Sequence, residues 1–170
     1  MNYPSFNSNE KNRKVVFNWD GSAGSIRTAA ELITGLNPSV VYAIHVQPHE
    51  SVYSYGAYSD GDKRMKSNLV QLELTNKFQR AAGDFSFFRS AELKLLFGDR
   101  ITEIAGFVQR TGAGILLTSP FSQSKFSRWL HGDLNSKLAS KLPGCEVISL
   151  DSQGRLKAES GSLTETGPNQ

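Results

Sequence analysis

Residues that could carry chemistry gather in a serine-rich, basic segment, residues 119–133 (SPFSQSKFSRWLHGD). Lys125 and Arg128 could bind an anion there, and the hydroxyls could hydrogen-bond a phosphate or accept phosphorylation. The hydroxyls belong to Ser119, Ser122, Ser124 and Ser127. Serine in a loop more often serves turn geometry, and a basic loop is more often simply solvated, so these alternatives stand beside anion binding and are preferred.

A second polar segment, residues 18–25 (NWDGSAGS), follows an apolar run near the start of the chain. Asp20-Gly21-Ser22 is a turn and helix-cap signal, so Asp20 could cap a helix. Trp19 could stack on an aromatic ligand, although an aromatic residue at the end of a strand more often belongs to the core. The segment is therefore open to a structural and a binding interpretation.

The sequence favours no catalytic or metal site. His45, His49 and His131 are not spaced with other ligands, and the chain has a single cysteine, Cys145. It contains no Gly-x-Ser-x-Gly turn and no pair of carboxylates placed for acid and base catalysis. We therefore expect a protein that is not an enzyme and that holds no metal.

Strand and helix patterns alternate between two polar tails, residues 1–12 and 152–170, and predict one α/β domain over residues 13–151. Short apolar runs predict strands at residues 14–19, 40–46, 91–97, 114–118 and 146–150. Apolar residues at helical spacing predict helices from Ser22 to Leu36, from Lys63 past Gly83, over residues 101–111, and over about residues 132–141.

The strands are too apolar for a sheet with one wet face, which favours a parallel sheet with helices on both faces. Ligands of such sheets lie beyond the carboxyl ends of the strands. Residues 18–25, the loop after Val46, and residues 119–132 should therefore meet at one edge of the sheet.

Bulk properties point to a cytoplasmic protein. The net charge of +3 is too small to predict nucleic-acid binding or a membrane surface. A single cysteine fits a reducing compartment, and no apolar run has the length of a membrane span or the form of a secretory signal.

Several landmarks resemble the universal stress proteins over roughly residues 13–151. They are a first strand ending in Asp-Gly-Ser (VVFNWDGSAGS), a second ending in His-Val (AIHV), a Gly-Asp turn before a helix (LLFGDRITEIA), and a fourth strand leading into a loop. The resemblance implies an open parallel five-stranded sheet of order 3-2-1-4-5, as in the adenine nucleotide alpha hydrolase-like folds. It also implies a homodimer joined through the last strand.

The resemblance also assigns roles at the sheet edge. Asp20 matches the residue that contacts base and ribose, and Val46 matches the position whose backbone meets the base. Asn18 and Trp19 flank the same pocket, and Thr118 ends the fourth strand beside the loop. Helix capping by Asp20 and an ordinary strand end at Val46 remain the structural alternatives.

The family's loop follows the pattern Gly-x2-Gly-x9-Gly-Ser/Thr, and this chain keeps its spacing but not its chemistry. The leading glycines fall on Ser119 and Ser122, the third on Gly132, and the final hydroxyl on Asp133. Glycine lets backbone N–H groups approach phosphate, and serine adds a side chain. The Asp133 carboxylate would repel phosphate by roughly 4 kcal/mol at about 4 Å and an effective dielectric constant near 20, which Lys125 could partly offset.

These observations predict a regulatory domain with weak or absent ATP binding and no required cofactor, acting in stress through dimerisation and a regulatory protein partner. The alternative is an adenine-nucleotide sensor, for ATP or AMP, with a rewired phosphate loop. A third hypothesis, ATP cleavage, needs a Ser-Gly-Gly-x-Asp-Ser turn after the first strand, and residues 20–25 (DGSAGS) lack that order.

Overall fold

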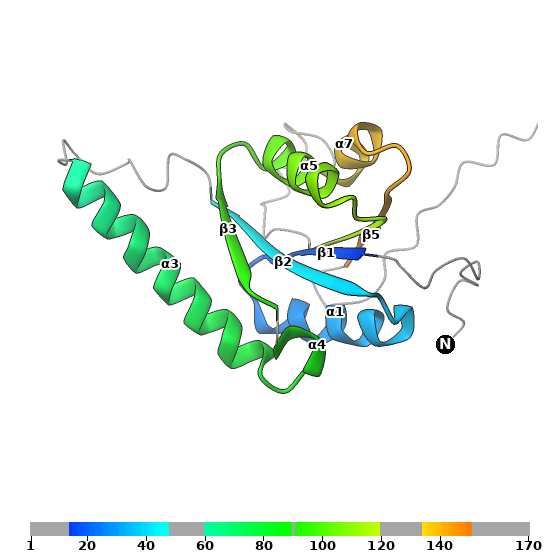
Figure 1. Cartoon of the computed structure of the whole chain (residues 1–170), viewed down its shortest axis with the longest axis horizontal. Helices are drawn as coiled ribbons and strands as arrows, with labels where there is room; N and C mark the ends of the chain where they lie inside the picture. The colour runs from blue at the N-terminus through cyan, green and yellow to red at the C-terminus, as the bar shows by residue number, and fades with distance from the viewer. Residues whose placement is uncertain (1–13, 48–59, 90, 120–133, 151–170) are drawn as a thin grey trace, which may run out of the picture.

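The computed structural model describes residues 14–47, 60–89, 91–119 and 134–150 (Figure 1). Within these ranges the strands form one parallel five-stranded sheet in the order β3-β2-β1-β4-β5, as predicted. The strands are β1 (Lys14–Asn18), β2 (Val40–Gln47), β3 (Leu93–Phe97), β4 (Ile115–Thr118) and β5 (Glu146–Ser149). β3 and β5 are the two edges of the sheet.

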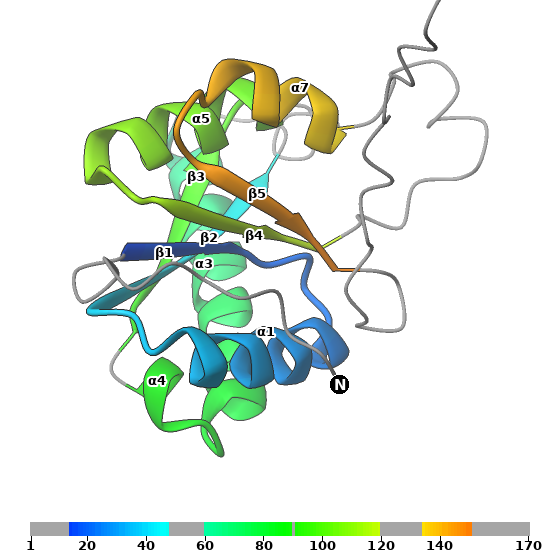
Figure 2. The same cartoon turned by 90° about the vertical axis from the view of Figure 1, so that its right-hand side faces the viewer.

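Helices cover both faces of the sheet. They are α1 (Ala23–Leu36), α3 (Asp60–Ala82), α4 (Ser86–Arg89), α5 (Arg100–Thr111) and α7 (Leu134–Lys141). Figure 2 shows α1 and α4 on one side of the sheet and α5 and α7 on the other. None of the described helices is both long and apolar enough to cross a membrane.

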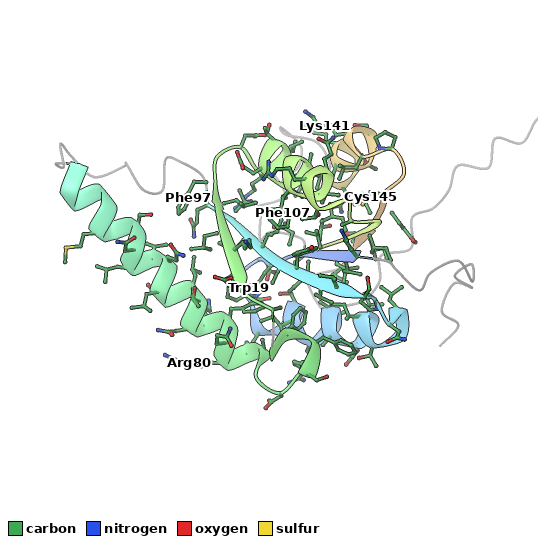
Figure 3. All side chains as sticks on the ribbon, viewed as in Figure 1. Trp19, Arg80, Phe97, Phe107, Lys141 and Cys145 are labelled. Atoms are coloured by element: carbon green, nitrogen blue, oxygen red, sulfur yellow. The ribbon has the colours of Figure 1, made fainter. Side chains whose placement is uncertain are left out.

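Side chains of the β1 segment alternate between the two faces of the sheet and contribute to a separate core on each face. Phe17 and Trp19 pack with α1, α3 and α4, whereas Val16 packs with α5 and α7. Successive side chains of a strand point to opposite faces, so a strand buried on both sides must be apolar throughout. In Figure 3, Trp19 and Phe107 lie on opposite sides of the sheet.

Local signals set the ends of α1 and α5. Ser22 caps α1, since its hydroxyl accepts a hydrogen bond from the Ser25 N–H. Asp99 caps α5 by accepting from the Thr102 N–H, and Gly112 ends α5 in the left-handed conformation at φ 64°. The predicted boundaries of both helices are therefore confirmed to within a few residues.

One helix prediction is wrong. The periodicity through Phe85 and Phe88 predicted a helix running past Gly83, but α3 ends at Ala82 and the chain turns into the separate helix α4. The Phe85 N–H donates to the Ala82 carbonyl at 2.9 Å, and the turn brings Phe88 against Phe17 with ring centroids 5.6 Å apart. The same apolar spacing thus arises from two separate helices that bury one aromatic cluster.

Cys145 precedes β5 and is expected to be a slow nucleophile. Burial, with a smaller contribution from the Glu146 carboxylate, raises the pKa of the thiol from 9.0 to about 11. Because only the thiolate reacts, two pKa units mean about 100-fold slower alkylation by iodoacetamide than the same chain shows in denaturant. Equal alkylation rates in the folded and the unfolded chain would contradict this.

The raised pKa of Cys145 also makes stability depend on pH. Cys145 favours the folded state below pH 9.0, and this contribution is lost as the pH rises towards 11.

Candidate functional site

The carboxyl ends of β1, β2 and β4 meet where the strand order reverses. From β1 the chain builds outward through β2 to β3 on one side, and β4 and β5 lie on the other. Asn18, the last residue of β1, lies in register with Ile44 of β2 and Thr118 of β4. This is the position at which open α/β sheets bind ligands.

Asn18 and Ser119 carry buried polar groups that find no partner among the described residues. Neither atom of the Asn18 side-chain amide has a hydrogen bond to any residue that the structure describes, and neither does the Ser119 hydroxyl. Both residues are almost completely buried. A buried polar group without a partner costs about 1–3 kcal/mol, so each of these groups calls for a partner that the described residues do not supply.

The backbone of Val46 adds a donor and an acceptor. The Trp19 N–H donates to the Ile44 carbonyl at 2.8 Å, so Ile44 directs its backbone groups towards β1. Alternate residues of a parallel strand face the same neighbour, and Val46 therefore faces the same side, where β1 has already ended at Asn18. No described residue bonds to the Val46 N–H or carbonyl. The role of Val46 in meeting a base stays a prediction.

Asp20 lies in the turn between β1 and α1 and is held by one oxygen. Its Oδ1 accepts from the Ser22 N–H at 2.9 Å and from the Ser25 hydroxyl at 2.7 Å. The helix cap itself is Ser22, so the capping role considered for Asp20 is wrong, and Asp20 instead closes the turn before the cap. No described residue bonds to Oδ2, which leaves one carboxylate oxygen for a ligand hydroxyl.

Trp19 belongs to the core, which is the structural interpretation of this residue. Its side chain has no exposed surface, and its ring packs edge-on against His45 and Phe78 with centroids 5.7 and 5.3 Å away. The indole N–H donates to the Ser22 carbonyl at 2.8 Å. Trp19 therefore positions the Asp20 turn and offers no ring face for stacking in this conformation.

Thr118 is tied to the helix on the α5 and α7 side. Its hydroxyl donates to the Asn135 side-chain oxygen at 2.6 Å, and Asn135 lies in the first turn of α7. Ser149 of β5 lies next to Thr118 in register and is also buried. Sequence reasoning missed Asn135 and Ser149. Ser149 had a signal in the sequence, since a polar residue stands near the end of the first, fourth and fifth predicted strands: Asn18, Thr118 and Ser149.

The remaining predicted site residues, Ser122, Lys125, Gly132 and Asp133, lie outside the described residues. The predicted phosphate half of the site thus stays a prediction, while the half formed by Asn18, Asp20, Val46 and Ser119 lies together at the sheet edge. Arg128 and the Tyr-rich segment around residue 55 also lie outside the described residues.

His45 bonds to the Trp19 backbone as a neutral imidazole. Its Nδ1 lies 2.8 Å from the Trp19 carbonyl, which can only accept, so Nδ1 carries the proton. Nε2 then accepts from the Gln47 side-chain amide at 3.2 Å. Burial lowers the pKa of His45 below 6.5, and the nearby Arg100 charge lowers it further, against the opposing hydrogen bond to Trp19. Both ring nitrogens of His45 are thus engaged within the fold, and His45 is a positioning residue.

Acidification is expected to destabilise the domain through His45. The depressed pKa means that His45 supports the folded state above 6.5, and this support is lost as the pH falls through 6.5 towards the folded-state pKa. The slope cannot exceed about 1.4 kcal/mol per pH unit for one proton. Urea unfolding across this range should show the slope in the parent chain and a smaller one in His45→Gln. Identical slopes would exclude His45 as the cause.

The described residues place binding groups at this edge. They contain no group of three or more His, Cys, Asp or Glu side chains that could hold a metal ion. They do place a backbone N–H and carbonyl, an amide, a carboxylate oxygen and a hydroxyl at one edge. That set can recognise a flat heterocycle with adjacent donor and acceptor atoms and an attached sugar.

Neither a family profile nor a curated protein matches this sequence. Solved structures do match the fold. A protein whose biochemical function was assigned from its structure superposes with TM-score 0.61 at 15% identity, covering 86% of this chain and 98% of its own. The universal stress protein UspA from Lactobacillus plantarum superposes with TM-score 0.55 at 12% identity, covering 83% of this chain and 99% of its own. A universal stress protein solved in complex with cAMP superposes with TM-score 0.54 at 14% identity, covering 84% of this chain and 98% of its own.

This chain therefore has the fold of the universal stress proteins. The resemblance inferred from the sequence landmarks is confirmed at the level of the fold and of the strand order.

Proposed function

We propose that this chain is a non-catalytic regulatory domain that binds an adenine nucleotide of low phosphate charge at the carboxyl ends of β1, β2 and β4. ATP would bind weakly or not at all. The observation that carries this proposal is the buried Asn18 amide, which has no partner among the described residues although it lies at the ligand-binding edge of the sheet. A bound nucleotide would supply the missing hydrogen bonds.

The chemistry of the edge suits adenine. The Val46 N–H can donate to a ring nitrogen and the Val46 carbonyl can accept from the exocyclic amino group, which is the donor and acceptor pair that adenine presents. The free oxygen of Asp20 is suited to a ribose hydroxyl, and the Asn18 amide and Ser119 hydroxyl would face the sugar or the first phosphate. The structural neighbour bound to cAMP supports a nucleotide with one phosphate as the ligand.

The expected preference for a nucleotide of low phosphate charge follows from the sequence of residues 119–133. Serines stand where two loop glycines are expected, and Asp133 stands where the family's loop has its final hydroxyl, so its carboxylate would repel the phosphates of ATP. Each added phosphate increases the repulsion from Asp133. The unpartnered groups at the nucleoside end thus favour the sensor hypothesis over a nucleotide-free scaffold.

Isothermal titration of the ligand-free protein with AMP, ATP and GMP tests the proposal. AMP should bind, and ATP should bind at least about ten-fold more weakly because of the charge at Asp133. GMP should not bind, because guanine presents an acceptor where adenine presents a donor. Equal affinity for AMP and GMP would contradict the role of Val46. ATP binding as tight as AMP would contradict the role of Asp133.

A second candidate is regulation through a homodimer joined at β5 and a protein partner, without nucleotide, in the cytoplasm. β5 is an edge strand, so its outer backbone groups are available to an identical strand. Val147→Pro, which removes an outward-facing N–H group from that strand, should reduce the dimer measured by light scattering. A chain that stays monomeric at micromolar concentration would contradict this candidate.

A further inference from the structure

The hydrogen-bond ladder between β1 and β2 stops one bond before its regular continuation. The Trp19 N–H donates to the Ile44 carbonyl at 2.8 Å, although β1 itself ends one residue earlier, at Asn18. In a parallel ladder, the carbonyl of a residue that donates in this way accepts from the residue two positions further along the neighbouring strand. For Trp19 that residue is Val46. Both residues are described, and no bond joins the Val46 N–H to the Trp19 carbonyl.

The side chain of His45 takes the place of the missing bond. Its Nδ1 lies 2.8 Å from the Trp19 carbonyl oxygen and donates to it. The Gln47 side-chain amide, 3.2 Å from Nε2, fixes the tautomer by donating to that nitrogen. The ring is also packed edge-on against the Trp19 indole, with centroids 5.7 Å apart. A side chain of β2 therefore satisfies the carbonyl that the β2 backbone would otherwise satisfy, and the Val46 N–H loses its regular acceptor.

The Val46 carbonyl is left open by a separate device, the turn after β1. A continued ladder would bring the Gly21 N–H to this carbonyl. Gly21 instead has φ 92°, in the left-handed region that glycine adopts without strain. The next N–H, of Ser22, donates to Asp20 Oδ1 at 2.9 Å and closes the turn into α1. The chain thus leaves β2 at this point, and both backbone groups of Val46 stay unpaired among the described residues.

An unpaired N–H at this position is unfavourable for the ligand-free fold. Val46 is completely buried, and nearly all buried backbone N–H groups are paired. An apolar residue in place of His45 would release the Trp19 carbonyl to Val46 and pair both groups. The arrangement around His45 therefore does not serve the ladder, and it is accounted for if a ligand pairs with the Val46 N–H.

We infer that His45 is the positioning residue for base recognition: by holding the Trp19 carbonyl, it keeps the ladder open and reserves the Val46 N–H for a ring nitrogen of the ligand. This inference rests on the nucleotide site proposed above. His45 acts through Trp19 and Val46 and does not itself contact the nucleotide. The ligand class that the open strand end selects is a heterocycle with a ring acceptor beside an exocyclic donor, as in adenine.

Nuclear magnetic resonance of the ligand-free, isotope-labelled full chain tests the bonding arrangement. A scalar coupling across the hydrogen bond between the Val46 amide nitrogen and the Trp19 carbonyl carbon should be absent in the parent chain. It should appear in His45→Leu, where the carbonyl is released to the ladder. Tyr42→Phe, a change in the same strand on the opposite face of the sheet, is the matched control and should resemble the parent chain.

A coupling between Val46 and Trp19 in the parent chain would overturn the inference, and so would its absence in a folded His45→Leu. The parent measurement decides the arrangement even if the leucine variant does not fold. It also needs no nucleotide, so it is independent of the proposed function.

Titration with AMP separates positioning from a merely structural role. His45→Leu should weaken binding about 10-fold or more, because the Val46 N–H is then bonded within the fold. His45→Asn carries a side-chain N–H near the place of Nδ1, so it should hold the Trp19 carbonyl and restore most of the affinity. An asparagine variant as weak as the leucine variant would overturn the role of Nδ1. A parent chain that binds no AMP would overturn the proposed function, while the couplings would still show whether His45 holds the ladder open.

Discussion

Trp19→Ala is expected to lower the free energy of unfolding by about 3–5 kcal/mol, a large part of the stability of a domain of this size. Trp19 is the largest fully buried side chain among the described residues. Its removal would leave a cavity beside Phe78 and His45 and would free the Ser22 carbonyl from its hydrogen bond to the indole. Because Ser22 caps α1, the substitution should also loosen the Asp20 turn.

Urea unfolding measures this loss, and two further variants separate its causes. Trp19→Phe keeps an aromatic ring in the core but removes the indole N–H, so it should cost clearly less than the alanine substitution, at least by about 1 kcal/mol. Met65→Ala, at an exposed position of α3, should change stability by no more than about 0.5 kcal/mol. A cost below about 1 kcal/mol for Trp19→Ala would mean that Trp19 is not a core residue.

Asn18→Leu is expected to weaken nucleotide binding strongly without destabilising the ligand-free fold. Leucine has nearly the shape of asparagine, and position 18 lies in register with Ile44, so a leucine there suits the apolar surroundings. It also removes a buried amide that has no partner among the described residues, which should raise the free energy of unfolding by about 1–2 kcal/mol. Affinity for AMP should fall about 10- to 100-fold, because polar groups of the ligand would then face an apolar side chain.

Two measurements on the same variant distinguish a binding role from a structural one. Thermal unfolding without ligand should show a melting temperature equal to or above that of the parent chain, and titration with AMP should show little heat. Thr118→Val, which removes the hydroxyl that bonds to Asn135, is the matched control: it should lower stability by about 1–2 kcal/mol and change AMP affinity much less. A strongly destabilised Asn18→Leu would mean that the amide is needed by the fold itself.

The elements of this domain were predictable because their signals are local. The five strands follow from short apolar runs, and the ends of α1 and α5 follow from Ser22, Asp99 and Gly112. The break between α3 and α4 was not predictable from periodicity. Phe85 and Phe88 continue the helical spacing of α3, and only the aromatic cluster of Phe88 with Phe17 and Phe78 favours a turn there.

The candidate site was predictable as a place but not as a set of interactions. The positions of Asn18, Asp20 and Val46 at strand ends follow from the order of elements along the chain. Their bonding does not, because it depends on groups distant in sequence. Asp20 is engaged by Ser22 and Ser25 rather than capping the helix itself, and Trp19 is enclosed by His45 and Phe78.

The sequence by itself determined the α/β class, the order of the elements and the edge of the sheet that holds the polar residues, since hydrophobic periodicity and capping act over a few residues. Tertiary structure decided which polar groups are satisfied and which are not. Asn18 and Ser119 remain without partners among the described residues, while Thr118 is bonded to Asn135. It also decided that α3 buries one apolar face and leaves the other exposed, because burial depends on what the rest of the chain brings against each surface.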